Sequence, residues 1–85
     1  MNKLPKPIKI NVVFKGEIAD VVGKTKETRT IPSGVDFIRF IFLICEDYYD
    51  LYEKYEPGMW EASLNGKRSK NETILKDGDE LVFYI

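Results

Sequence analysis

The chain has 85 residues, which is enough for one small domain and too few for two. Hydrophobic residues make up 44% of it, so a packed core can form and global disorder is not expected. Its formal net charge of −1 argues against nucleic acid as a partner, because binding to phosphates needs a basic surface.

Cysteine usage and the N-terminus indicate the compartment. The single cysteine, Cys45, cannot form an internal disulfide, which suits a reducing cytoplasm. Residues 1–7 form a short leader without the apolar segment of a secretion signal. The longest apolar run, Phe40–Cys45, is far too short to cross a bilayer. We therefore expect one domain over residues 1–85, cytoplasmic and without membrane contact.

Two strands are predicted in the N-terminal third. Ile8–Phe14 alternates apolar and polar side chains, as a half-buried strand does. The apolar residues between 18 and 22 are expected to form a compact turn that Gly23 closes. Thr25–Ile31 predicts a second strand, antiparallel to the first, and Pro32-Ser33-Gly34 ends it.

One long helix is predicted next. Asp36 is expected to be its N-cap, and the helix runs to about Tyr55, where Pro57-Gly58 terminates it. At about 100° per residue, the helix has one broad apolar face that must pack on the sheet. The residues on this face are Phe37, Phe40, Ile41, Ile44, Tyr48, Leu51, Tyr52 and Tyr55.

The C-terminal third completes the sheet. Met59–Leu64 predicts a third strand, and Asn65-Gly66 signals a type I′ turn into a short strand around Lys67–Ser69. Asp77-Gly78-Asp79 is expected to turn into Glu80–Ile85, which is apolar enough for a central strand. The order is ββαββ. It predicts an α+β fold of the β-grasp kind, with one main helix across a mixed sheet of four or five strands and the first and last strands adjacent at its centre.

Short motifs occur in a fixed order along the chain. Val12-Val13-Phe14 followed by Ile18–Lys24 resembles the first strand and the turn of MoaD, the small subunit of molybdopterin synthase, and Ile31-Pro32-Ser33-Gly34 resembles its "L-P-x-G" before the helix. Leu64-Asn65-Gly66 and Leu75–Leu81 resemble the "V-N-G" and "L-x-D-G-D-E-V" that MoaD shares with ThiS. The resemblance to the MoaD/ThiS sulfur carriers, which have a ubiquitin-like β-grasp fold, extends from about Ile8 to Ile85.

The resemblance implies a chemistry that depends on the C-terminus. In this family an adenylating enzyme activates the carboxylate of a terminal glycine, and sulfur then replaces the adenylate. The resulting thiocarboxylate delivers sulfide to molybdopterin or thiazole synthesis. The tail must end in Gly-Gly, whose lack of Cβ atoms lets it enter a narrow channel. This chain stops at Ile85, within strand character, so no carrier residue can be transferred onto it.

Two functions follow as expectations. The first is a non-catalytic, ubiquitin-like protein–protein interaction module that binds a partner through its sheet or through its helix. The alternative is a sulfur carrier of the molybdopterin or thiamine type whose Gly-Gly tail is absent from this chain. The partners of such a carrier would be an adenylating enzyme or the large subunit of a synthase.

Catalysis by the chain itself is not expected. It has no histidine, and Glu46 and Asp47 next to Cys45 oppose formation of a thiolate. Cys45 is therefore predicted to be a small, partly buried helix residue. Trp60 is either a core residue against the helix end or a binding anchor. No catalytic, cofactor-binding or metal-binding residue is predicted.

The predicted helix is more apolar than one sheet can cover. Ile38, Phe42, Cys45 and Tyr49 form a second ridge, displaced by about 100° from the centre of the core face. Either the 18–22 turn and the leader wrap this ridge, or it contacts another protein, as a homodimer or with a partner subunit. These four residues are the candidate protein-contact residues.

Overall fold

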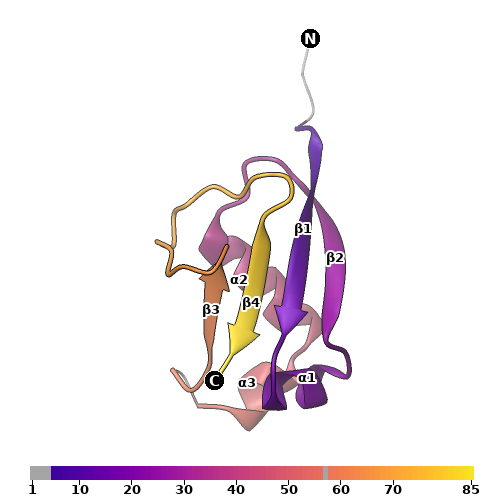
Figure 1. Ribbon diagram of the computed structural model, residues 1–85, viewed down its shortest axis with the longest axis vertical. Helices are drawn as coiled ribbons and strands as arrows, with labels where there is room; N and C mark the ends of the chain where they lie inside the picture. The colour runs from indigo at the N-terminus through magenta and orange to yellow at the C-terminus, as the bar shows by residue number, and fades with distance from the viewer. Residues whose placement is uncertain (1–4, 57) are drawn as a thin grey trace.

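The computed structural model describes residues 5–56 and 58–85 and contains a mixed sheet with helices across one of its faces (Figure 1). Residues 1–4 of the predicted leader and Pro57 of the predicted helix stop lie outside the described residues. The elements, in chain order, are β1 (Pro7–Phe14), α1 (Glu17–Val22), β2 (Lys26–Pro32), α2 (Phe37–Asp47), α3 (Asp50–Lys54), β3 (Glu61–Leu64) and β4 (Glu80–Tyr84).

The sheet has the strand order β2-β1-β4-β3. β1 pairs antiparallel with β2 and parallel with β4, and β3 pairs antiparallel with β4. The predicted adjacency of the first and last strands at the centre is confirmed. The short strand predicted around Lys67–Ser69 is wrong, because Lys67 forms only an isolated bridge to Leu64.

The apolar turn predicted between residues 18 and 22 is a short helix, α1. Its buried residue is Ile18, which packs into the core. α1 ends at Gly23, whose φ of 88° is left-handed and whose N–H donates to the Ala19 carbonyl at 2.8 Å. Glycine adopts this conformation without the steric penalty that other residues have, so the predicted role of Gly23 as a stop is confirmed.

The predicted start of the main helix is confirmed, and its predicted length is wrong. The Asp36 carboxylate accepts a hydrogen bond from the Arg39 N–H at 2.9 Å, which caps α2. The helix ends at Asp47, and the next helix, α3, begins at Asp50. Tyr48 lies between them with φ −121° and ψ 65°, outside the helical region.

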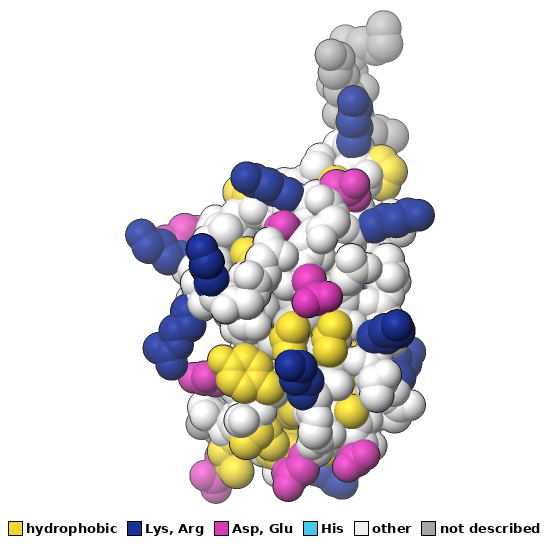
Figure 2. Space-filling model, in the orientation of Figure 1, with side chains coloured by type: hydrophobic (Ala, Val, Ile, Leu, Met, Phe, Trp, Pro, Cys, Tyr) yellow, Lys and Arg dark blue, Asp and Glu magenta, His cyan; other side chains and the backbone are white. Residues whose placement is uncertain are grey.

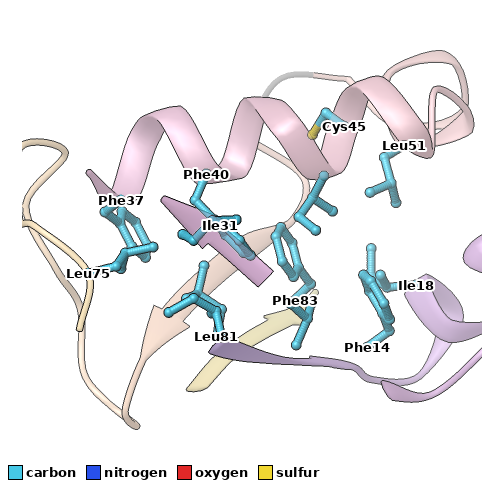
Figure 3. Packing of buried hydrophobic residues seen from close by; sticks show 13 residues of the cluster. Phe14, Ile18, Ile31, Phe37, Phe40, Cys45, Leu51, Leu75, Leu81 and Phe83 are labelled. Carbon is cyan, nitrogen blue, oxygen red and sulfur yellow. The ribbon is translucent and has the colours of Figure 1, made fainter. Parts of the chain in front are cut away.

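The core lies between the sheet and the helices (Figure 3). Leu51 reaches it from α3, whereas Tyr52, which the continuous helix would have placed in the core, is 46% exposed. Leu75, from the loop before β4, closes one end of it. The buried residues are Ile10, Val12, Phe14, Ile18, Ile31, Phe37, Phe40, Ile44, Cys45, Leu51, Leu75, Leu81 and Phe83.

The predicted Asn-Gly and Asp-Gly-Asp turns are both present and are joined to each other. Asn65 (φ 52°) and Gly66 (φ 80°) have the two positive φ angles of a type I′ turn. The Asn65 amide donates to the Asp79 carboxylate at 2.9 Å and accepts from the Glu80 N–H at 2.9 Å. Asp77 in turn accepts from the Lys9 N–H at 2.7 Å. These bonds fix the start of β4 relative to β1 and β3.

Candidate protein-binding surfaces

The face of the sheet that turns away from the helices has an apolar centre. Strand alternation puts Val13 of β1 and Val82 and Tyr84 of β4 on this face, since Val12, Leu81 and Phe83 are buried on the other. Val13 and Val82 are direct neighbours in the register, and all three outward side chains are half-buried. We call Val13, Val82 and Tyr84 the sheet patch.

Figure 2 shows this face, with apolar side chains gathered over the lower parts of β1 and β4. A shallow depression of about 490 Å³ lies over Val82 and Tyr84, and its polar lining comes from Lys15, Ser63 and Glu80. A hydrogen bond with Glu61 raises the pKa of the Tyr84 hydroxyl. Sheets covered on one side only usually have a polar outer face, so this apolar centre is unusual.

The predicted helix ridge is only partly a surface. Phe42 is 53% exposed and Tyr49 is 62% exposed, while Ile38 is half-buried. Cys45 is instead fully buried in the core, so the structure does not bring all four predicted contact residues onto one surface. The break after Asp47 also separates Tyr49 from the axis of α2, on which the predicted spacing depended.

Cys45 is a fully buried residue of α2 and belongs to the hydrophobic core (Figure 3). Burial raises the pKa of its thiol, with a hydrogen bond to Tyr52 acting in the opposite sense. A buried thiol whose pKa is raised is a poor nucleophile.

A polar cluster on the helix side of β2 was not predicted. The Glu27 carboxylate accepts hydrogen bonds from the Arg29 Nε, at 2.7 Å, and from the Tyr48 hydroxyl. Arg29 also forms an ion pair with Asp47, at the end of α2. Burial acts to raise the pKa of Glu27, but the hydrogen bonds from Tyr48 and Arg29 and the charges of Arg29 and Lys24 outweigh it and lower that pKa. Every charged group here has a partner, which indicates a structural role.

Over the described ranges 5–56 and 58–85, no helix is both long and apolar enough to cross a bilayer. Ile85 follows β4 at the margin of the sheet and is 60% exposed.

Comparison with known proteins bears on the fold. No protein-family model matches the sequence, and neither does any curated protein. Solved structures do match. A protein described as molybdopterin converting factor subunit 1 from Pyrococcus furiosus superposes with a TM-score of 0.80 over 89% of this chain and 94% of its own, at 21% identity. This chain has the ubiquitin-like β-grasp fold.

Two further structures share the fold. Small archaeal modifier protein 1 from H. volcanii has a TM-score of 0.76 at 12% identity, over 89% of this chain and 94% of its own. The protein of the same name from Methanosarcina acetivorans has a TM-score of 0.70 at 19% identity, over 92% of each chain. The fold predicted from the sequence motifs is therefore confirmed, in the form that MoaD-like proteins and small archaeal modifiers share.

Proposed function

We propose that this chain is a non-catalytic protein-binding module of the ubiquitin-like carrier or modifier kind, and that it contacts its partner through the sheet patch. The observation that carries the proposal is the pair Val13 and Val82, with Tyr84 beside it, on the two central strands. Exposed apolar clusters rimmed by polar residues are typical of protein interfaces. The β-grasp fold and its carrier and modifier neighbours support the same kind of activity.

The resemblance to the MoaD/ThiS carriers suggests the class of partner, and the fold neighbours are compatible with it. A β-grasp carrier acts by being bound, and the partners to test first are the adenylating enzyme and the synthase large subunit encoded in the same genome. Their binding surfaces must be apolar at the centre to match Val13 and Val82. A cation or a hydrogen-bond donor facing Glu80 would complete the fit.

The test is a binding titration with a double variant, V13T/V82T. Threonine keeps the β-branched shape and the strand propensity of valine, so the fold is retained while the apolar centre becomes polar. We expect the variant to bind the partner at least about tenfold more weakly, because two hydroxyls lose their water at the interface.

The matched control is Thr30→Val, the reverse exchange on the same face but in the edge strand β2. It should leave the affinity unchanged. If the double variant binds with the affinity of the wild type, the sheet patch is not the binding surface. If the wild-type chain binds neither enzyme, the proposed partner class is wrong.

The sulfur-carrier alternative needs a Gly-Gly tail joined to β4. It is favoured by the exposure of Ile85, because residues joined there would begin in solvent and could reach an enzyme. Mass spectrometry of the natural gene product, incubated with ATP, a sulfur donor and the adenylating enzyme, separates the two functions. Replacement of one carboxylate oxygen by sulfur identifies a carrier, whereas an unchanged mass with intact binding identifies a module.

A further inference from the structure

A groove runs between α2 and β3, on the side of the molecule away from the polar cluster of β2. Its volume is about 360 Å³. Its walls are mostly apolar, and Glu61, Arg68 and Ser69 are the polar residues at its margin. The apolar lining consists of Phe37, Ile38, Ile41, Trp60, Ala62 and Tyr84. Ile38, one of the predicted contact residues, thus lines a concave surface.

β3 is at the edge of the sheet, and among the strands that the structure describes none pairs with its outer side. The Asn65 N–H donates to Glu80 of β4, whereas the Leu64 N–H donates away from β4, to the Lys67 carbonyl. Because successive residues of a strand point their N–H and C=O groups to opposite edges, those of Ala62 point outward like those of Leu64. Ala62 therefore offers a donor and an acceptor to an added strand.

The groove ends at a basic segment. Lys67, Arg68 and Lys70 follow β3 closely, and Lys and Arg side chains gather along this margin of the molecule (Figure 2). The Arg68 side chain is 87% exposed, and its only ion pair in the described part of the chain is with Glu61, at 3.2 Å. An exposed ion pair of this kind is easily exchanged for another carboxylate.

We propose that this groove binds an extended, acidic segment of a partner protein, which adds to the sheet as a strand beside β3. The Ala62 backbone would form the main-chain hydrogen bonds of strand addition. Alternate side chains of the segment would point between Ile38 and Ile41 of α2, because side chains of a strand alternate between faces. Acidic residues at its end would meet Arg68 and its basic neighbours, and this complementarity selects an acidic segment.

The probe is an acetylated and amidated peptide, Asp-Glu-Val-Thr-Val-Thr-Val-Glu-Asp. Its valines share one face, and both ends are acidic, so it can bind in either direction. Trp60 is the only tryptophan of the chain and lines the groove, so its fluorescence reports binding. We expect saturable binding that weakens with salt, amide shifts at Ile41 and slower hydrogen exchange at Ala62.

Two variants test the contacts. Ala62→Pro removes the outward N–H while leaving the pairing with β4, and should weaken binding at least about fivefold. Thr30→Pro removes an outward-pointing N–H from the other edge strand, β2, and should not change the affinity for the peptide. Arg68→Glu should weaken binding about as much as Ala62→Pro, whereas Lys26→Glu, in β2, should not.

The proposal is overturned if the peptide does not bind up to its solubility limit, or if a peptide with lysines in place of its acids binds equally well. It is also overturned if Ala62→Pro and Arg68→Glu bind like the wild type. If Ala62→Pro fails to fold, Arg68→Glu and the exchange rate of Ala62 decide. A dimer mass that Ala62→Pro abolishes would assign the groove to a second copy of the chain instead.

This groove is separate from Val13 and Val82, although Tyr84 lies beside both surfaces. The variant V13T/V82T should therefore bind the peptide normally. Loss of partner binding through the sheet patch and loss of peptide binding through the groove are thereby distinguishable.

Discussion

Glu27 and Arg29 occupy positions on β2 that face the helices, where apolar side chains would be expected. They stay there because each charged group has a partner: Arg29 bridges Glu27 and Asp47, and Tyr48 donates to Glu27. The Tyr48 ring also packs edge-on against Phe14, with 5.6 Å between the ring centres. A single tyrosine thus connects the polar cluster to the core.

The Glu27 carboxylate makes stability depend on pH. Its pKa is lower in the folded chain than the value of about 4.3 for an unperturbed glutamate. Its contribution is therefore present above the unfolded pKa and is lost as the pH falls through the folded pKa. We expect Glu27→Gln to reduce the free energy of unfolding by about 1–3 kcal/mol near pH 7, and by less in acid.

Urea unfolding of the wild type and of Glu27→Gln, at neutral pH and in acid, measures the difference in their free energies of unfolding. Glu53→Gln, an exposed substitution in α3, is the control and should change little at any pH. A loss of stability for Glu27→Gln that is the same in acid as at neutral pH would contradict the role assigned to the carboxylate.

Local sequence patterns predict some of these residues and not others. The Asp36 cap depends on hydrogen bonds within the next turn, so the sequence alone identifies it. The Glu27 cluster depends on Tyr48, which is 21 residues further along the chain. Charged residues on a strand predict solvent exposure, and only the tertiary structure shows that their partners are Asp47, at the end of α2, and Tyr48, directly after it.

Among the elements, the division of the main helix into α2 and α3 has the largest effect. At the division, Tyr48 leaves helical geometry and donates to Glu27, while Asp47 pairs with Arg29, so both side chains contact β2. The bend turns Leu51 into the core and leaves Tyr52 at the surface. The periodicity of the sequence predicted both as core residues, because a continuous helix places them on one broad face.

Paired alanine substitutions test this bend. Leu51→Ala should destabilise the protein by about 2–5 kcal/mol, as expected for a fully buried leucine. Tyr52→Ala should cost much less, because nearly half of its surface is already exposed. Thermal or urea unfolding of the two variants measures the contrast, and equal losses would indicate the continuous helix instead.

The whole molecule has two sides with different characters. Val13 and Val82 lie on the outer face of the sheet. Phe42, in α2, and Tyr49, after it, are exposed on the helical side. The strand order and the sheet–helix arrangement were predictable, because strand alternation and turn residues act locally and in a fixed order. The surfaces were not, since the exposure of a side chain depends on which elements cover it.

The exposed aromatic residues on the helical side support the predicted homodimer as a further proposal. Phe42 is 53% exposed, and the rings of Tyr49 and Tyr52 meet edge-on with centres 6.2 Å apart. We expect the wild-type chain to self-associate as its concentration rises, and Phe42→Asp to stay monomeric and folded, because a charge cannot be buried there without a partner. Sedimentation velocity checks this, and identical masses for both proteins at every concentration would contradict it.

The Asn65-Gly66 turn, which is hydrogen-bonded to Asp79 and Glu80, affects how long the protein stays chemically intact. Asparagine before glycine is prone to deamidation, because the glycine nitrogen can attack the side-chain amide unhindered. Here that amide is held between Asp79 and the Glu80 N–H, at 2.9 Å on each side, which restrains the attack. Once formed, an aspartate or isoaspartate would lose the donor to Asp79 and place a second negative charge beside it. The link between the two turns would then open. We therefore expect deamidation in a purified sample to begin at Asn65, at a rate set by how often the start of β4 unfolds locally.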